Sequence, residues 1–423
     1  MNVLIIGGGG REHALAWKLA RDTPGARLHC APGNAGTAAV GHNIALGAED
    51  MDGLLAWARR ERPDLTIVGP EAPLCAGLTD RFWAEGLTVF GPSAAAARIE
   101  GSKRFAKDVM RAAGVPTAAA EAFTEREAAI ACARLRGAPV VVKADGLAAG
   151  KGVTVCATVE EAEQAIVEAL ECGAFGEAGR TVLIEECLEG EEVSILALVD
   201  GERVVPLASA QDHKRALDGD RGPNTGGMGA YSPAPVVRDD LEEAIRARVL
   251  EPTVSELRRR GIEYRGVLYA GLMIASDGPK ALEFNCRFGD PETQAILPRW
   301  DGDLGAALYD CALGRLNPAA LRWRPEACVC VVMAAGGYPG PYRKGDPITG
   351  LEEAASRPGV TVFHAGTALR DGRLVTAGGR VLNIAAVGAD IREARDRAYA
   401  AVERIHFANA HYRRDIATRA LSA

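Results

Sequence analysis

Three polar side chains at alternate positions, Glu283, Asn285 and Arg287, form the clearest chemical pattern in the sequence. In an extended strand they point to one face, while the apolar Leu282 and Phe284 point to the other. A carboxylate and an amide oxygen at this spacing can both bind a hard divalent cation that also binds phosphate oxygens. The arginine beyond them can bind a phosphoryl group or a carboxylate through two hydrogen bonds. The pattern predicts a site for phosphoryl chemistry. A solvent-facing polar strand is the plainer alternative.

A second candidate is Lys143, which ends the apolar run 140–142 and precedes the glycine-rich segment 146–152. This segment is not a Walker loop, because its first two glycines enclose only three residues and Gly152 replaces the hydroxyl that would hold Mg²⁺. It instead predicts a strand, a hairpin loop carrying Lys151, and another strand. A lysine at a strand end suits phosphate charge, and the glycines permit a mobile flap over phosphates. A surface hairpin with solvated lysines is the alternative.

A run of glycines, Gly7–Gly10, follows the apolar residues Val3–Ile6 and precedes a helical pattern. Backbone N–H groups and the helix dipole at such a place can hold an anion such as a monophosphate. The dinucleotide fingerprint G-x-G-x-x-G is not met, because Glu12 or His13 stands in its third glycine position. A hydride-transfer enzyme is therefore not expected. A tight turn that requires small residues is the alternative.

The acidic segment 184–194 joins two apolar runs. The backbone of a strand edge can contact a purine, and a carboxylate that follows it can bind ribose hydroxyls. A solvated acidic turn is an equally good interpretation of this segment on its own.

These candidate groups need a scaffold, and the first hundred residues supply alternating strand and helix patterns. Short apolar strands with helices between them indicate a doubly wound parallel sheet, whose ligands bind at the carboxyl ends of the strands. Further along, a polar glycine-rich stretch over 211–231 precedes a long charged helix over 239–259. The chain from about residue 324 has β character and ends in a helix over 391–405.

Composition excludes several classes of protein. The 423 residues include 49 basic and 56 acidic side chains, so a net charge of −7 gives no bulk attraction for nucleic acid. No apolar run approaches the roughly 20 residues of a membrane-spanning helix. The start of the chain lacks the basic residues of a signal peptide, and the ten cysteines include no C-x-x-C. We expect a cytoplasmic protein with buried, reduced thiols.

Taken together, these segments resemble the ATP-grasp superfamily and, within it, the glycinamide ribonucleotide synthetase family. The resemblance covers essentially the whole chain. The matching segments are GGGGREHAL at 7–15, GSKRFA at 101–106, KADGLAAGKG at 143–152, QDHKRALDGDRGPNTGGMGAYS at 211–232, LYAGLM at 268–273, LEFNCRFGDPETQ at 282–294, VMAAGGYPG at 332–340 and FHAGT at 363–367.

The resemblance implies an α/β and α+β multidomain protein. Its expected parts are an N-terminal doubly wound parallel-sheet domain (1–100), a central ATP-grasp domain (101–323) with a mobile lid at about 117–188, and a β-rich C-terminal domain (324–423). The implied reaction joins glycine to 5-phosphoribosylamine through glycyl phosphate, giving glycinamide ribonucleotide, ADP and phosphate in purine biosynthesis. The resemblance implies ATP as a substrate and Mg²⁺ or Mn²⁺ as the metal ion, and no nucleic-acid or membrane partner is expected. Nothing in the sequence indicates a dimer interface, so we expect a monomer.

The same resemblance assigns roles to individual positions. Arg287 and Lys143 would be catalytic, with Glu283 and Asn285 as metal ligands. Glu185, Glu186 and Leu188 would border adenine, and Glu192 would bind the ribose. The full set expected around ATP is Lys103, Lys143, Gly150, Lys151, Gly152, Glu185, Glu186, Leu188 and Glu192. The set expected around glycine and the amine is Gly9, Gly10, Asp212, Lys214, Asn224, Thr225, Gly226 and Arg287.

One position departs from the superfamily pattern. Gly271 stands where many relatives carry a further acidic metal ligand, so the number of metal ions is left open. Two alternative functions also stay open at this point. One is a ligase of the same fold with another amino acid or ribonucleotide as substrate, and the other is a nucleotide sensor without catalysis.

Overall fold

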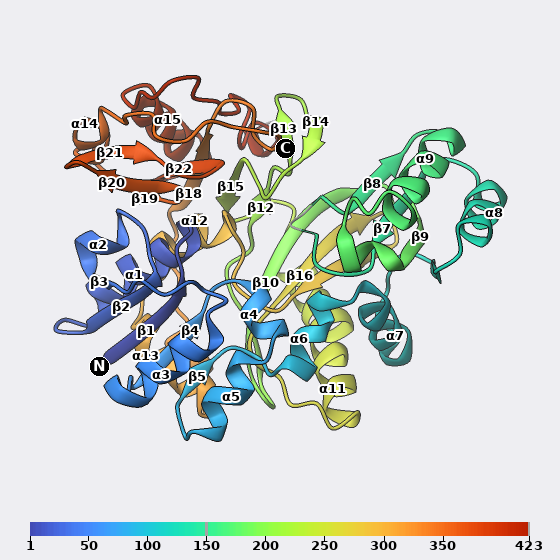
Figure 1. Ribbon diagram of the computed structural model, residues 1–423, viewed down its shortest axis with the longest axis horizontal. Coiled ribbons are helices and arrows are strands. Elements are labelled where there is room, and N and C mark those ends of the chain that lie inside the picture. The colour runs from blue at the N-terminus through green and yellow to red at the C-terminus, as the bar shows by residue number, and fades with distance from the viewer. Residues whose placement is uncertain (149–150, 422–423) are drawn as a thin grey trace.

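The computed structural model describes residues 1–148 and 151–421 of the chain. Figure 1 shows the N-terminal strands and helices, the C-terminal strands beside them, and a projecting unit that carries β7, β8 and β9. Long strands, β10 and β16, run through the region between these parts (Figure 1). Segments from the whole length of the chain therefore meet around one centre.

The N-terminal part is a five-stranded sheet in the order β3-β2-β1-β4-β5, with every pair parallel. Leu4 and Ile6 pack into one hydrophobic core and Val3 and Ile5 into another, so both faces of β1 are buried. This confirms the predicted doubly wound sheet. Its strands are β1 (Asn2–Gly7), β2 (Arg27–Pro32), β3 (His42–Asn43), β4 (Leu65–Val68) and β5 (Val89–Phe90). Its helices are α1 (Gly10–Asp22), α2 (Thr37–Val40), α3 (Met51–Glu61), α4 (Glu71–Cys75), α5 (Leu78–Ala84) and α6 (Ala94–Gly101).

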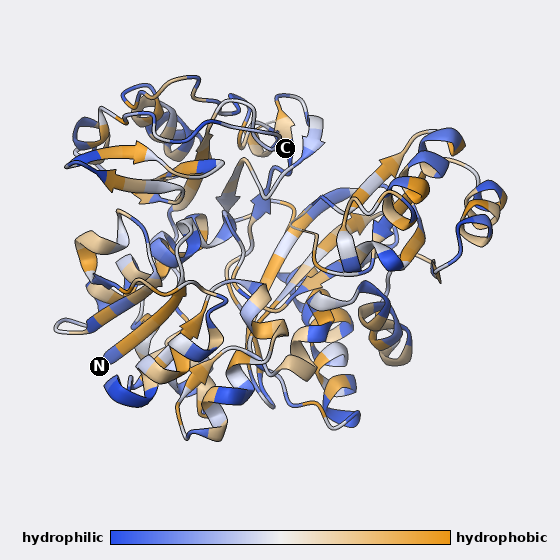
Figure 2. Cartoon of the chain, in the orientation of Figure 1, coloured by the Kyte–Doolittle hydropathy of each residue, from blue (hydrophilic) through white to orange (hydrophobic). Residues whose placement is uncertain are grey.

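The projecting unit, residues 120–186, is called the lid unit below. Its sheet has the order β6-β9-β7-β8, and two helices cover it around a separate hydrophobic core. Figure 2 shows its strands largely orange and the helices carrying blue segments, as expected for helices with a solvent-facing side. The elements are β6 (Ala120–Phe123), α8 (Arg126–Arg136), β7 (Val140–Ala144), β8 (Val153–Cys156), α9 (Val159–Leu170) and β9 (Val182–Glu186).

The central sheet has the order β11-β10-β16-β17, and all its pairs are antiparallel. The predicted helix over 239–259 forms, but residues Arg246–Leu250 within it are a π-helix rather than regular α-helix. The strands are β10 (Glu191–Asp200), β11 (Val204–Pro206), β16 (Arg265–Ala275) and β17 (Gly278–Asn285). The helices are α7 (Lys103–Ala113), α10 (Asp239–Ile245), α11 (Glu251–Arg259), α12 (Glu292–Ile296) and α13 (Leu304–Ala312).

The C-terminal sheet has the order β12-β15-β18-β22-β19, so it takes two strands from the polar stretch 211–231 and its neighbour Ser232. We propose three units, 1–100, 101–323 and 324–423, with these two strands crossing from the second to the third. The strands are β12 (Gln211–Asp212), β13 (Arg215–Leu217), β14 (Arg221–Asn224), β15 (Gly229–Ser232), β18 (Ala327–Ala334), β19 (Val360–His364), β20 (Thr367–Arg370), β21 (Arg373–Thr376) and β22 (Arg380–Gly388). The helices are α14 (Leu351–Ala355) and α15 (Ile391–Val402).

All ten cysteines are free thiols, as predicted. The prediction that they are buried is wrong for Cys172, which is exposed just after α9, and holds only partly for Cys75, Cys132 and Cys187. Among the residues that the structure describes, none of the helices combines the length and the apolar character needed to cross a membrane.

The N-terminal and C-terminal parts meet at His13 of α1. The backbone N–H of His364 donates to His13 Nδ1 at 2.8 Å, and the His13 ring packs edge-on against Phe363. Asn34 Nδ2 also spans the junction, donating to the carbonyls of Gly8 and His364. The glycine turn is therefore held against β19 by polar contacts.

We expect the protein to lose stability as the pH falls below about 6.5. Burial lowers the pKa of His13 and of His213 to about 3, and that of His364 to about 4. The unfolded chain binds these protons near pH 6.5 while the folded protein stays neutral. Each histidine therefore stabilises the fold fully above the unfolded pKa, and this contribution is lost at about 1.4 kcal/mol per pH unit as the pH falls from 6.5 towards 4. Denaturation midpoints between pH 7.5 and 5 measure the effect. His364→Asn should make the dependence shallower, whereas a wild-type midpoint that is constant over this range would contradict the prediction.

Candidate active site

A cavity of about 870 Å³ lies where the parts of the chain meet. Its walls come from the N-terminal part, the lid unit, the central sheet and the C-terminal part, represented by Arg11, Lys143, Glu283 and Arg380. The predicted residues that line it are Lys103, Lys143, Lys151, Gly152, Glu185, Glu186, Leu188, Glu192, Asp212, Lys214, Asn224, Thr225, Gly226, Glu283, Asn285 and Arg287. Their individual roles stay predictions. Gly150 lies outside the described residues.

Strand β17 presents the predicted metal ligands, but not by simple alternation. Gly271 pairs with Glu283 while Leu272 pairs with Ala281, so Leu282 is an extra residue in the strand, a β-bulge. Leu282 and Phe284 both line the cavity with Glu283 and Asn285, although strict alternation had predicted these two apolar residues on the opposite face. The carbonyl of Leu282 accepts a hydrogen bond from Lys143 Nζ at 3.1 Å.

Glu283 and Asn285 offer one carboxylate and one amide oxygen to the cavity. Burial favours the neutral acid, but the ammonium groups of Lys214 and Lys143 help to hold the pKa of Glu283 below its ordinary value. Gly271 pairs with Glu283 and has no side chain, so position 271 brings no further carboxylate to the pair. Within the described ranges, no cluster of three or more His, Cys, Asp or Glu side chains could hold a metal ion. The oxygen pair fits Mg²⁺ or Mn²⁺ only if phosphate oxygens and waters complete the coordination.

Arg287 is held rigidly by two carboxylates that sequence reasoning missed. Its guanidinium pairs with Glu71 at 3.2 Å, where α4 begins, and with Glu100 of α6 at 3.0 Å. It also donates to Asn285 Oδ1 at 3.3 Å. Although burial opposes the charge, Glu100 and Glu71 hold the pKa of Arg287 above its ordinary value. A cation fixed in this way is preorganised to receive a developing negative charge.

Lys143, near the end of β7, shares a buried carboxylate with Lys107 of α7. Glu185 Oε2 lies 2.9 Å from Lys143 Nζ and 3.2 Å from Lys107 Nζ. Lys107 also donates to Thr117 Oγ1 and to the carbonyl of Ala118. Glu185, which was predicted to border adenine, therefore also forms ion pairs with two lysines.

Lys103 stands at the start of α7, which Ser102 caps. Its Nζ donates to the carbonyl of Gly146, the first residue of the glycine-rich segment. Lys151, in the same segment, donates to the carbonyl of Pro339 in the C-terminal part at 3.2 Å. The described residues of this segment, 146–148 and 151–152, thus line the cavity with contacts to α7 and to the C-terminal part.

Two of the predicted substrate residues, Asp212 and Lys214, belong to a cluster of charged side chains that lines the cavity. Lys214 lies 3.1 Å from Glu192 and 3.8 Å from Glu283, and Thr225 Oγ1 donates to the Lys214 carbonyl. Burial raises the pKa of Asp212 to about 7, against the opposing charge of Lys214. Glu192, predicted to bind ribose, is thus an ion-pair partner of Lys214 as well.

Gly9 and Gly10 are the described residues of the predicted set that do not line the cavity. The backbone N–H of Gly9 donates to Glu12 Oε2 at 2.6 Å, and a Cβ on Gly10 would lie 2.2 Å from Asn383 Nδ2. This turn therefore packs against its own helix and against β22. Contact of these two glycines with a substrate stays a prediction.

The structure adds five cavity-lining residues to the predicted set, and most of them come from distant segments of the chain. Arg11, Glu71, Glu100, Lys107 and Arg380 all line the cavity, and none belongs to the predicted set. A signal existed for Lys107, which lies one helical turn after Lys103 and so on the same side of α7. The others reach the site through contacts that local patterns do not contain.

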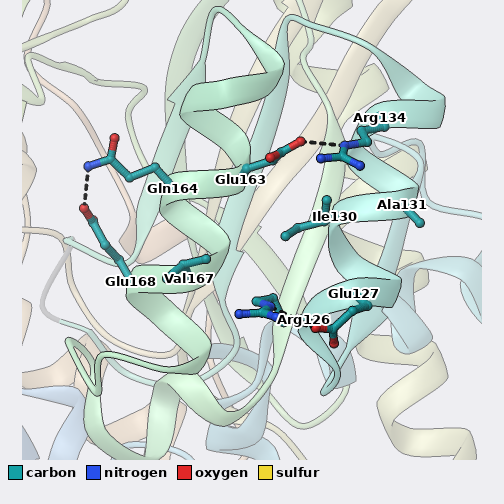
Figure 3. A pocket seen from close by; sticks show the side chains of 9 residues that line it. All are labelled: Arg126, Glu127, Ile130, Ala131, Arg134, Glu163, Gln164, Val167 and Glu168. Atoms are coloured by element: carbon teal, nitrogen blue, oxygen red, sulfur yellow. Dashed lines mark hydrogen bonds and ion pairs between the residues drawn. The ribbon is translucent and has the colours of Figure 1, made fainter.

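A second hollow of about 910 Å³ lies between α8 and α9 on the lid unit (Figure 3). It is more open than the central cavity, and its charged side chains pair across it, as Arg134 does with Glu163 at 2.6 Å. None of the predicted site residues lines it. We assign the chemistry to the central cavity.

A lysine-lined cavity under a lid unit, with a carboxylate–amide pair and a fixed arginine, defines an ATP-grasp site. Family models match the chain in three consecutive parts of phosphoribosylglycinamide synthetase: the N domain over residues 1–100, the ATP-grasp (A) domain over 101–293 and the C domain over 328–419. The chain belongs to the phosphoribosylglycinamide synthetase family.

Individual relatives agree with this membership. A phosphoribosylamine–glycine ligase of Vibrio cholerae serotype O1 is 52% identical over 426 residues, covering 100% of this chain and 99% of the relative. That of Escherichia coli strain K12 is 53% identical over 427 residues, with the same coverage. The crystal structure of the Thermotoga maritima ligase has a TM-score of 0.85 at 36% identity, covering 98% of this chain and 100% of that one. A biotin carboxylase domain from Hydrogenobacter thermophilus, at 18% identity and a TM-score of 0.74, covers 97% of this chain and 91% of its own and shares the fold.

Proposed function

We propose that this chain is an ATP-dependent ligase that joins glycine to 5-phosphoribosylamine, giving glycinamide ribonucleotide, ADP and phosphate in de novo purine biosynthesis. The observation that carries the proposal is the meeting of Lys143, Glu283 and Arg287 in one cavity of a chain that aligns with 99% of the length of its family relatives. Each supplies one requirement of phosphoryl transfer: phosphate binding, metal binding and stabilisation of the transferring group.

In the first step, a carboxylate oxygen of glycine attacks the γ-phosphorus of ATP, ADP leaves, and glycyl phosphate forms. Lys103 and Lys143 would bind the phosphates of ATP, with Lys151 and Gly152 covering them. Arg287 would stabilise the transferring phosphoryl group, since Glu71 and Glu100 hold its guanidinium in place before the reaction.

In the second step, the amine nitrogen of phosphoribosylamine attacks the acyl carbon and the bond from that carbon to the phosphate oxygen breaks. Phosphate leaves with one former carboxylate oxygen, and the nitrogen loses a proton. Asp212, Lys214 and the loop 224–226 would contact glycine and the amine. Because an acyl phosphate hydrolyses readily, the cavity has to exclude water, which the contact between Lys151 and the C-terminal part supports.

A divalent cation would be held by Glu283 and Asn285, both of which carry oxygens of the kind that Mg²⁺ and Mn²⁺ prefer. When bound, it would neutralise the charge of the phosphate oxygens. The same lysines that lower the pKa of Glu283 keep this carboxylate ionised and ready to bind it.

We also propose that the chain acts as a monomer in the cytoplasm. All the described residues of the predicted site except Gly9 and Gly10 line one cavity of this chain, which is compatible with a monomer. The ten free thiols are compatible with a reducing compartment.

The amino-acid specificity of ADP release tests the function. Purified chain, ATP, Mg²⁺ and phosphoribosylamine are combined with glycine, alanine or serine, and ADP is followed by a coupled assay. We expect turnover with glycine and at least about tenfold lower kcat/KM with alanine, on the scale that an added methyl group costs in a fitted site.

Two outcomes would overturn the proposal in different ways. Equal turnover with alanine would contradict the glycine assignment and favour another carboxylate–amine ligase. Binding of ATP without turnover under saturating substrates would favour a nucleotide sensor.

A further inference from the structure

The end of the cavity beyond Arg287 carries an arginine from the C-terminal part. Nη1 of Arg380 donates to the carbonyls of Gly226 at 2.6 Å and Asp290 at 2.7 Å, and Nη2 lies 3.1 Å from Asp290 Oδ2. These contacts fix one edge of the guanidinium. Among the described residues, nothing pairs with Nε or with the second hydrogen of Nη2, although Arg380 lines the cavity.

A second arginine reaches the same end from the first turn of α1. Arg11 is 7% exposed, its Nε donates to Glu12 Oε1 at 2.6 Å, and its Nη1 donates to the carbonyl of Phe288 at 3.1 Å. In the part of the chain that the structure describes, Nη2 of Arg11 has no partner, and this side chain also lines the cavity. Neither arginine has an atom among the fully buried polar atoms that lack a partner, so these free donors face the cavity, where donors on two arginines suit an anionic ligand.

The carboxylate of Asp290 interacts electrostatically with both arginines. Burial favours the neutral acid, but Arg380 and Arg11 hold the pKa of Asp290 below its ordinary value. Asp290 is therefore an anion that orients Arg380 from one edge. The donors left over suit a phosphate monoester, which accepts paired hydrogen bonds from guanidinium groups.

The contacts of these side chains indicate which phosphate this is. Lys103 and Lys143 contact residues of the lid unit, Gly146 and Glu185. Arg287, where phosphoryl transfer is proposed, donates to the same Phe288 carbonyl as Arg11 and so lies beside it. Because Arg11 and Arg380 come from the N-terminal and C-terminal parts and not from the lid side, we assign the lysines to ATP and the two arginines to the amine substrate.

We propose that Arg11 and Arg380 bind the 5′-phosphate of the amine substrate. This inference rests on the proposed function. The backbone N–H of Gly9 is already bonded to Glu12, so the phosphate contact is assigned to the side chains of Arg11 and Arg380 and not to the backbone of Gly9. The N-terminal and C-terminal parts thus share recognition of a single substrate group.

Binding of ribose 5-phosphate tests the inference, with ribose as the probe that lacks the phosphate. Calorimetry on the full chain compares wild type with Arg380→Gln, Arg380→Lys and Arg11→Gln. Arg373→Gln, at the exposed first residue of β21, removes the same charge from the same part of the chain and is the matched control. We expect Arg380→Gln and Arg11→Gln each to weaken ribose 5-phosphate at least about tenfold, as for loss of a hydrogen bond to a charged group. Arg380→Lys should weaken it less, and Arg373→Gln should not weaken it.

Turnover separates this inference from the proposed function. The arginine variants should raise KM for phosphoribosylamine about tenfold or more while KM for ATP stays within about twofold. Unchanged binding of ribose 5-phosphate in folded variants, or an equal loss for ribose or ATP, would overturn the inference. If Arg380→Gln does not fold, Arg11→Gln and Arg380→Lys decide the question. A wild-type chain inactive with glycine and phosphoribosylamine would instead contradict the proposed function.

Discussion

Replacing Arg287 with alanine is expected to lower kcat by about a hundredfold or more, which is the scale seen when one preorganised transition-state donor is removed. The guanidinium is fixed by Glu71 and Glu100 before substrates arrive, so its charge costs no reorganisation at the moment of transfer. Steady-state kinetics with ATP, glycine and phosphoribosylamine give kcat and each KM. A loss confined to KM would show that Arg287 binds the ground state and the transition state equally, and would contradict this role.

Stability has to be measured beside that variant. Alanine leaves Glu100 and Glu71 without their partner, and Glu100 has a side-chain exposure of only 7%. Arg287→Lys is the control, because it keeps the positive charge between the carboxylates but loses the planar fork that binds two oxygens at once. We expect this variant to fold like wild type and still to lose most of kcat. Full activity in Arg287→Lys would assign Arg287 a purely electrostatic or structural role.

Lys143→Met is expected to lower kcat/KM for ATP by about a hundredfold, the scale of a lost charged phosphate contact in a closed site. An ammonium has three donors, and Lys143 uses two on Glu185 and on the carbonyl of Leu282, which leaves one for a phosphate oxygen. Lys107→Met is a matched control. It removes the same charge from beside Glu185, but the donors of Lys107 are already taken by Thr117, Ala118 and Glu185.

The two lysine variants should therefore differ in whether they lose stability or catalytic efficiency. We expect Lys107→Met to lower the unfolding midpoint more than it lowers kcat/KM for ATP, and Lys143→Met to do the reverse. An equal loss of kcat/KM in both variants would mean that Lys143 acts only by holding Glu185. The pairing with Glu185 would then be the functional contact.

The residues that the sequence could predict are those whose chemistry lies within one segment. The spacing of Glu283, Asn285 and Arg287 on a strand, and the position of Lys143 before a glycine-rich loop, need only local geometry. The bulge at Leu282 was not predictable from this spacing, because it is set by pairing with Gly271 and Leu272 on the neighbouring strand. The register of Leu282 against the neighbouring strand depends on that pairing.

Residues brought to the cavity by distant segments could not be found locally. Arg11 and Phe288 are 277 positions apart, and Arg380 and Gly226 are 154 apart. The glycines of the turn before α1 were expected to hold phosphate. Their tight packing against Glu12 and Asn383 gives another physical reason for small residues there.

The fold was predictable to a similar degree. Alternating short strands and helices predicted the N-terminal parallel sheet, because each strand and helix can be recognised from its own residues. A short, continuously apolar strand is also typical of a sheet that is buried on both faces. The polar stretch 211–231 contributes strands to the C-terminal sheet, where β15 pairs with β18 about a hundred residues later along the chain. The strand β15 forms because it is hydrogen-bonded to a distant strand and not because of the preferences of its own residues. The composition of the segment 211–231 therefore does not predict it.

Formation of glycyl phosphate requires that one carboxylate oxygen of glycine leave in the released phosphate, and transfer of oxygen-18 measures this. The chain is supplied with ATP, Mg²⁺, phosphoribosylamine and glycine labelled with oxygen-18 in its carboxylate, and the released phosphate is analysed by mass spectrometry. We expect one labelled oxygen in each phosphate, formed together with ADP and glycinamide ribonucleotide. Unlabelled phosphate released with ADP would mean that another group receives the phosphoryl from ATP, and would rule out a glycyl phosphate intermediate.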